Sequence, residues 1–292
     1  MQPTRARARV SQYLFIAPAA ALVGVYVYNS IAFNAYTSLF DWNGVSPTRE
    51  FIGFGNYVAL FSDDLFRSAL INTFIFGAVS VTVQAAFGFV LAWWVRRRIL
   101  FRGAFKAIYF APIILSTAAV APLARTILAP DGAVNQFVGA VTLSHVSQAW
   151  LADPATVLGT LCVINIWQNT GFSFVLYHAA LTQIDPEIYD SARVDGASNF
   201  VTMTRIAWPL VRPTTAALLI LGAIASLKTY ELVFLVTRGG PAGASEVLST
   251  YLYRQGILQF HAGYGSAIAM AMLAIALVLT VFQLRTYARR SR

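Results

Sequence analysis

Six long runs of apolar residues, separated by shorter polar segments, dominate the pattern along the chain. The runs cover residues 14–36, 69–95, 107–129, 157–183, 214–236 and 264–286. Each is long enough to cross the roughly 30 Å hydrocarbon core of a bilayer as a helix. None shows the dyad alternation in short segments that an outer-membrane barrel requires. The pattern predicts an all-α, polytopic membrane protein with six transmembrane helices and a single transmembrane domain over residues 1–292.

Composition and charge agree with a membrane location and indicate an orientation. Apolar residues make up 58% of the chain and charged residues 11%, which is improbable for a soluble domain of 292 residues. Of the 21 Lys and Arg residues, 15 fall on one side of the predicted membrane, four on the other and two in or near the runs. The positive-inside rule then places both termini in the cytoplasm. The net charge of +9 indicates orientation and contact with lipid headgroups, and not a nucleic-acid partner.

The chain shows no constellation for catalysis, for a metal or for nucleotide binding. Cys162 is the single cysteine, and the three histidines occupy different segments without ligand spacing. A phosphate-binding loop of the Gly-x-x-x-x-Gly-Lys-Ser/Thr type is missing, because the two lysines, Lys106 and Lys228, stand in other contexts. We therefore predict no metal, no cofactor in this chain and no enzymatic activity. Any ATP and Mg²⁺ would be bound by a separate ATPase.

A polar segment, residues 185–213, lies between the fourth and fifth apolar runs. Asp185 can cap a helix, and Pro186 suits its first turn, where no amide donor is needed. Asp195 and Gly196 then form the strongest turn signal of the region. Ser198 can cap a second helix, on which Phe200, Met203 and Ile206 form an apolar stripe. Pro209 and Pro213 limit this helix. The segment predicts a helix-turn-helix that can fill a groove in a partner.

The spacing in this segment resembles the EAA loop of the permeases of binding-protein-dependent ATP-binding-cassette (ABC) importers. The matching positions are Asp190, which matches only in charge, and Ala192, Asp195, Gly196, Ala197, Ile206 and Pro209. The family pattern usually begins Glu-Ala-Ala and ends Ile-x-Leu-Pro, so Asp190, Ser191 and Trp208 depart from it. In that family the EAA loop sits in a cleft of a cytoplasmic ATPase. The resemblance implies that residues 185–213 couple the chain to such a partner.

Further segments look like the carbohydrate branch of these permeases, of the maltose or glycerol-phosphate type. They are residues 41–42, 53–57, 165–172, 235–241 and 263–267. The resemblance implies a type I ABC importer permease fold in a bacterial plasma (inner) membrane. It also implies a second homologous permease, two copies of an ABC ATPase, an extracytoplasmic solute-binding protein and a sugar substrate.

Polar residues inside the fourth run are candidates for the substrate path. Asn165, Gln168, Asn169 and Phe172 follow helical spacing and offer amide groups beside an aromatic ring. That combination suits a sugar, whose hydroxyls need hydrogen bonds and whose C–H face can lie on a ring. Hydrogen bonding between helices by the same amides is the alternative.

The fifth run adds a second set of candidates. Ser226 and Thr229 look like positions that line the sugar site in the resembling family. Lys228 and Glu231 are three residues apart, so they could form a structural ion pair or meet the substrate. Neutral mono- to oligosaccharides are the expected substrates, although Lys228 leaves room for an anion.

An ion-coupled secondary transporter of a small polar solute is the alternative function. Arg125, Lys228 and Glu231, in or near the membrane, favour it. The elaborate loop at residues 185–213 and the lack of a carboxylate relay disfavour it. The sequence thus favours a permease driven by a separate ATPase.

Overall fold

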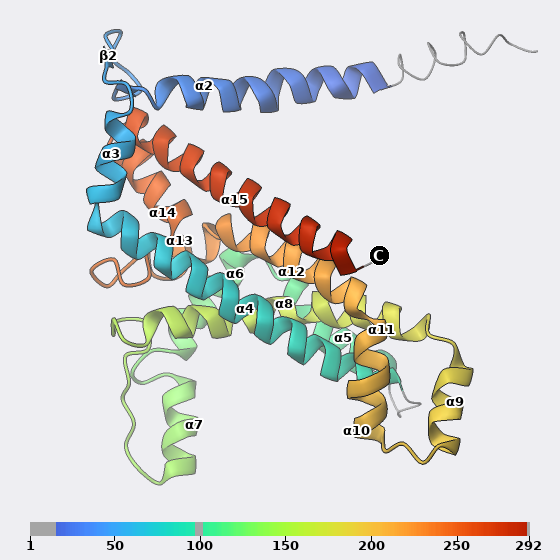
Figure 1. Cartoon of the computed structure of the whole chain (residues 1–292). Coiled ribbons are helices and arrows are strands. Elements are labelled where there is room, and N and C mark those ends of the chain that lie inside the picture. The colour runs from blue at the N-terminus through green and yellow to red at the C-terminus, as the bar shows by residue number, and fades with distance from the viewer. Residues whose placement is uncertain (1–15, 97–101, 291–292) are drawn as a thin grey trace, which may run out of the picture. The chain divides into compact units, whose positions relative to one another are not determined.

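The computed structural model describes residues 16–96 and 102–290 and is built almost wholly of helices (Figure 1). Its one sheet among these residues is a small antiparallel pair, β1 (Phe40–Asp41) and β2 (Glu50–Phe51). Contacts divide the described residues into two compact units, 16–63 with 252–274 and 64–251 with 275–290. The single transmembrane domain stays a prediction, and each unit is described by itself.

The first unit contains a long N-terminal helix and an ordered segment that follows it. The helix runs from Ile16 to Thr37 and includes a π-helical stretch, η1 (Val23–Tyr28), before α2 (Asn29–Thr37). After the β1–β2 pair come α3 (Gly55–Ser62), η3 (Arg254–Leu258) and the first part of α15 (Ala262–Arg290).

Hydrogen bonds tie the segment after α2 to the start of α15. The Asn56 side chain donates to the carbonyls of Ser38 and Phe40, and Tyr264 Oη donates to Asp63 Oδ2 at 2.6 Å. The segment between α2 and α4 is therefore ordered and held against the start of α15.

The second unit holds the remaining helices, with α4, α8 and α12 at its centre. They are α4 (Asp64–Arg96), α5 (Arg102–Ile114), α6 (Thr117–Ile127), α7 (Ala133–Thr142), α8 (Val157–Thr182), α9 (Pro186–Val194), α10 (Asn199–Val201), η2 (Thr202–Ala207), α11 (Trp208–Leu210), α12 (Arg212–Leu227), α13 (Glu231–Val236) and most of α14 (Leu248–Tyr253). The last part of α15 also belongs to this unit.

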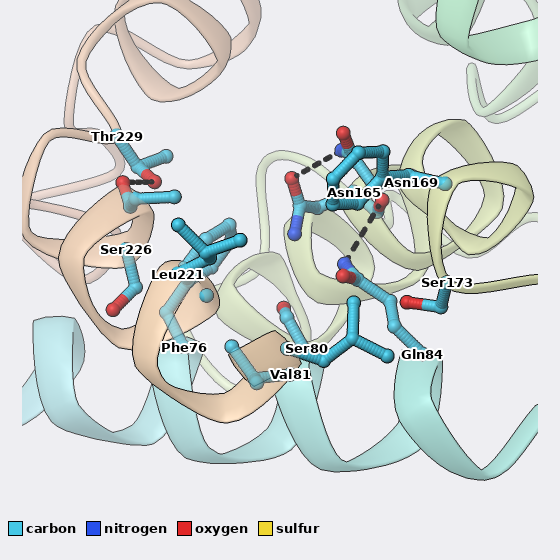
Figure 2. Close-up of a pocket in the computed structure, with 14 residues that line it drawn as sticks. Phe76, Ser80, Val81, Gln84, Asn165, Asn169, Ser173, Leu221, Ser226 and Thr229 are labelled. Atoms are coloured by element: carbon cyan, nitrogen blue, oxygen red, sulfur yellow. Dashed lines mark hydrogen bonds between the residues drawn. The ribbon is translucent and has the colours of Figure 1, made fainter. Parts of the chain in front are cut away.

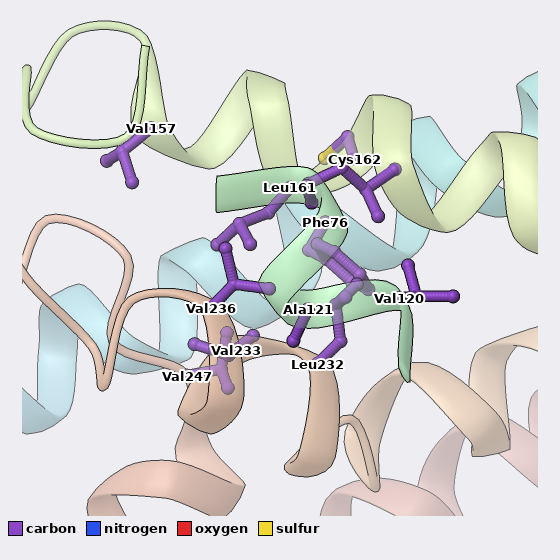
Figure 3. Close-up of a cluster of buried hydrophobic side chains, with 12 residues drawn as sticks. Phe76, Val120, Ala121, Val157, Leu161, Cys162, Leu232, Val233, Val236 and Val247 are labelled. Atoms are coloured by element: carbon purple, nitrogen blue, oxygen red, sulfur yellow. The ribbon is translucent and has the colours of Figure 1, made fainter. Parts of the chain in front are cut away.

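Two apolar cores hold the second unit together. In the first, Phe76 of α4 packs with Val120 and Ala121 of α6, Leu161 of α8 and Val233 of α13 (Figure 3). The second joins the later turns of α4 and α8 to the segment that the sequence predicts as a coupling loop. Because both cores contain α4 and α8, these two helices form the frame of the unit.

All six predicted runs are helical, but two of them are broken. In the third run α5 and α6 meet at an angle of 97°, because the Ser116 side chain accepts a hydrogen bond from Ala119 N and starts a new helix. In the fifth run α12 ends at Leu227, and α13 begins only at Glu231. The prediction of one continuous helix is therefore wrong for residues 107–129 and for residues 214–236.

Three described helices are long and apolar enough to cross a membrane, and five spans result if each bent pair counts as one. The three are Ile16–Thr37, Asp64–Arg96 and Ala262–Gln283. The fourth predicted run forms α8, one continuous helix of 26 residues with amide side chains near its middle. Those amides interrupt the apolar run of α8.

Candidate functional site

A cavity of about 330 Å³ lies among α4, α8 and α12 in the second unit (Figure 2). Its wall carries both hydroxyl and amide groups as well as apolar side chains. The lining residues are Phe76, Ser80, Val81, Gln84, Asn165, Asn169, Phe172, Ser173, Leu218, Leu221, Gly222, Ala225, Ser226 and Thr229. Five of the eight predicted substrate-path residues are among them.

The amides of α8 form a connected polar wall on one side of this cavity. Asn169 Nδ2 donates to Asn165 Oδ1 and to the Asn165 carbonyl, both at 3.0 Å. From α4, Gln84 Nε2 donates to the same carbonyl at 3.3 Å, as Figure 2 shows. The three amides keep further donors and acceptors beside the Phe172 ring, which also lines the cavity.

Gln168 does not belong to this wall. Its side chain is buried, and its Nε2 donates at 3.0 Å to the carbonyl of Leu115, at the break between α5 and α6. At about 100° per residue, Asn165, Asn169 and Phe172 lie within an arc of about 60° around the helix axis. Gln168 lies outside this arc. Gln168 therefore makes a hydrogen bond between helices, which was the alternative to a place in the substrate path.

Two hydroxyls, one in the last turn of α12 and one just after its end, line the cavity but bond back to carbonyls of α12. Ser226 Oγ donates to the Ala223 carbonyl at 2.8 Å, and Thr229 Oγ1 donates to the Ala225 carbonyl at 3.1 Å. Each hydroxyl can still accept a hydrogen bond from a ligand. Such bonds to the preceding turn also weaken a helix, which fits the end of α12 at Leu227.

The charged candidates of the fifth run lie outside the cavity lining. Lys228 caps α12 and Glu231 starts α13, and both residues are exposed in the chain by itself. In the part of the chain that the structure describes, no ion pair joins them, because the helix is interrupted between them. Arg125 has a structural partner, since its Nε donates to the Val236 carbonyl at the end of α13 at 2.8 Å.

The contribution of α4 to the cavity was missed from the sequence. Gln84 is an amide inside an apolar run, which is the same signal that singles out Asn165. The close contact of α4 with α12 gave no such signal. A Cβ atom on Gly77 would lie 2.5 Å from Ser226 Oγ, so only glycine lets the two helices approach here.

The segment predicted to couple the chain to a partner is a helix-turn-helix, as expected. Asp185 Oδ1 accepts a hydrogen bond from Glu187 N at 3.0 Å and caps α9. At the other end, Gly196 has φ +74°, and Ala197 N donates to the Ala192 carbonyl at 2.9 Å. This is a Schellman motif, in which the residue at the position of Gly196 must adopt a left-handed conformation. A Cβ atom on Gly196 would find open space, so its backbone angle is the constraint, not a close contact.

The second helix of this segment differs from the prediction in two respects. It continues through Pro209 to Leu210, because the π-helical turn η2 just before accommodates the missing amide donor. The predicted stripe is also divided. Phe200 is exposed, whereas Met203 packs against the second core and Ile206 is half-buried.

The helix-turn-helix packs firmly on the ends of α4 and α8. Tyr189, Ala192 and Ala207 are buried, whereas Asp190, Asp195 and Gly196 are exposed. Asp190 also pairs with Arg193 at 3.1 Å on the surface, and Ala197 is half-buried. The segment thus has one face in the core and one free face.

Trp208, which departs from the family pattern, completes an aromatic cluster. Its ring centroid lies 4.8 Å from that of Phe89 on α4 and 6.3 Å from that of Tyr177 on α8. Phe89 and Tyr177 are themselves 5.5 Å apart in an edge-to-face arrangement. Tryptophan can therefore stand where the family pattern has leucine, because its ring packs against two aromatic rings of α4 and α8.

Comparison with known proteins gives consistent matches. Residues 84–292 match the family described as binding-protein-dependent transport system inner membrane component. The chain is 32% identical to the probable ABC transporter permease protein YurN of Bacillus subtilis, over 96% of each chain. It is 29% identical to the lactose transport system permease protein LacF of Rhizobium radiobacter, over 97% of this chain and 95% of LacF.

The fold of the present chain matches a crystal structure of a bacterial ABC transporter involved in the import of the acidic polysaccharide alginate. The TM-score is 0.83, with 27% identity over 98% of each chain. The chain also matches a structure of a bacterial alginate ABC transporter in complex with an alginate pentasaccharide-bound periplasmic protein. Here the TM-score is 0.84, with 26% identity over 98% of this chain and 96% of the other chain. The predicted type I importer permease fold is confirmed.

Proposed function

The chain belongs to the family of binding-protein-dependent transport system inner membrane components, and we propose that it forms the path for a carbohydrate in an ATP-driven importer. Members of this family are transport subunits, not enzymes. One observation carries the proposal: the helix-turn-helix at residues 185–213 packs on α4 and α8, and it continues into α12. The same three helices line the cavity, so a force applied to the loop reaches the walls of the cavity.

The chemistry of the cavity supports a neutral sugar as the substrate. Its lining combines three amides and four hydroxyl side chains with two phenylalanine rings, and no charged side chain is among the 14 lining residues. Sugar hydroxyls can exchange hydrogen bonds with the amides of Asn165 and Asn169. LacF, a lactose permease, supports the same class, whereas the alginate transporters carry an acidic polysaccharide.

Partners and orientation follow from the same proposal. The chain would pair with a second homologous permease and receive the sugar from an extracytoplasmic solute-binding protein. Two copies of a cytoplasmic ABC ATPase would bind ATP and Mg²⁺ and engage the free face of residues 185–213. The protein would lie in the bacterial plasma membrane with this loop and both termini in the cytoplasm, as its 15 basic residues on that side indicate. Residues 1–15 and 291–292 lie outside the described part.

Cross-linking from Val194 tests the contact with the ATPase. Val194 is the last residue of α9, and 88% of its surface is exposed. A photoactivatable group on a Val194→Cys variant should cross-link to the ATPase in the assembled importer, because α9 presents this residue on the free face. The native Cys162 is buried and should not be labelled. A cysteine at Asn43, in the segment after α2, is the matched control and should give no product with the ATPase.

A cross-link from Asn43 but not from Val194 would contradict both the docking face and the orientation. Because the ATPase is cytoplasmic, a product from Val194 also fixes the side of the membrane on which the loop lies.

A further inference from the structure

Arg96, the last residue of α4, lies between two aromatic rings. Its Cζ is 4.2 Å from the centroid of the Trp93 ring and 3.7 Å from that of the Tyr189 ring. Trp93 precedes Arg96 by one turn of α4, whereas Tyr189 belongs to α9. The guanidinium therefore bridges the frame and the first helix of the coupling segment.

The surroundings of Arg96 favour a strong contact. Only 1% of Trp93 and 6% of Tyr189 is exposed, and cation–π contacts strengthen when they are withdrawn from water. Burial raises the pKa of Tyr189 more than the nearby Arg96 lowers it, so the phenol is neutral at physiological pH, and the guanidinium lies over the face of a neutral ring.

A second contact holds the other helix of the segment to the same part of α4. Phe89, two turns before Arg96, meets Trp208 at 4.8 Å between ring centroids. The last turns of α4 thus contact both helices of the segment, α9 through Arg96 and α11 through Phe89.

The same helix lines the cavity with Phe76, Ser80, Val81 and Gln84. From Gln84 to Trp93 the axial distance is about 14 Å, at 1.5 Å per residue. The coupling segment continues covalently into α12, but only through a 66° bend. Its connection to α4, by contrast, consists of side-chain contacts alone.

We propose that Arg96 is a positioning residue that clamps α9 to α4, so that movement of the coupling segment displaces the α4 wall of the cavity together with the α12 wall. This inference rests on the proposed function. Without the clamp, α12 would still follow the segment through the backbone, while α4 would lag behind. Hydrolysis of ATP would then be less tightly linked to movement of the sugar.

The test compares Arg96→Met with three controls in the fully assembled importer. Methionine keeps an apolar stem but removes the planar cation. Arg96→Lys keeps the charge, Tyr189→Phe keeps the ring face, and Arg67→Met, at the other end of α4, removes an arginine whose exposed ion pair with Asp64 contributes little. Two quantities are measured: hydrogen exchange of the α9 amides, and sugar imported per ATP hydrolysed.

Arg96→Met should raise the exchange rate of the α9 amides about 2- to 30-fold, which is the range that one cation–π contact supports. It should also lower the ratio of sugar to ATP. Tyr189→Phe and Arg67→Met should match the wild type in both measurements, and Arg96→Lys should fall between. Tyr189→Leu removes the contact from the side of α9 and should repeat the Arg96→Met result, which guards against a folding defect peculiar to one variant.

Unchanged exchange in both Arg96→Met and Tyr189→Leu would overturn the clamp. Faster exchange with an unchanged ratio would overturn its role in coupling. If the wild type showed no ATP-dependent import, the proposed function would fail, and the positioning role would fail with it. The exchange measurement on α9 distinguishes these cases, because it needs no transport.

Discussion

Replacing Gly196 by valine should abolish uptake and weaken the association with the ATPase, while the helices of the second unit remain folded. Gly196 has φ +74° in the Schellman motif that ends α9. A left-handed conformation costs an L-residue about 1–2 kcal/mol, and it is most unfavourable for β-branched residues such as valine. The chain would leave this conformation and turn α9 away from the second helix. The free face that the ATPase must recognise would then be lost.

Two matched variants separate this effect from a general intolerance of glycine replacement. Gly196→Asn should be far milder, since asparagine tolerates left-handed angles. Gly159→Ala should resemble the wild type, because Gly159 lies in α8 where a Cβ atom finds open space. Co-purification of the ATPase and uptake of sugar are the two measurements. A Gly196→Val protein with wild-type values for both would show that this loop is not the mechanical link.

Alanine at Asn165 or at Asn169 should raise the KM for the sugar, while the ATPase stays bound. Each substitution removes amide groups from the polar wall of the cavity, and Asn169→Ala also deletes its bonds to Asn165. A hydrogen bond lost in a dry site costs about 1–3 kcal/mol, so the expected rise is about 5- to 150-fold. Initial rates of uptake over a range of sugar concentrations give the KM.

Gln168→Ala is the natural control, because Gln168 lies on the same helix but outside the cavity lining. Its loss frees the Leu115 carbonyl at the break between α5 and α6, so we expect lower thermal stability with an unchanged KM. An unchanged KM in both asparagine variants would assign these amides a structural role instead.

The features that the sequence predicted well are those set by neighbouring residues. Asp185, Gly196 and Ser198 define the caps and the turn of the coupling segment through bonds to residues at most five positions away. The apolar runs likewise follow from length and composition. Both kinds of signal are local, so one sequence was enough to place them.

The features that were missed depend on contacts between distant segments. Nothing in the local pattern shows that Gln84 faces Asn165, or that Gln168 turns to the Leu115 carbonyl. The predicted pairing of Lys228 with Glu231 assumed one continuous helix, and the chain breaks between them. Periodicity places a residue on a face of its helix, but the partner of that face is fixed only by tertiary packing.

Uptake by the reconstituted importer tests most directly that this chain is driven by a separate ATPase. Proteoliposomes would contain both permeases and the ATPase. The solute-binding protein and a labelled neutral disaccharide would be on the side of the membrane opposite the ATPase. We expect uptake with hydrolysable ATP on the ATPase side, and none with a proton or sodium gradient alone. Uptake that follows the ion gradient and ignores ATP would contradict the account and would establish ion-coupled transport.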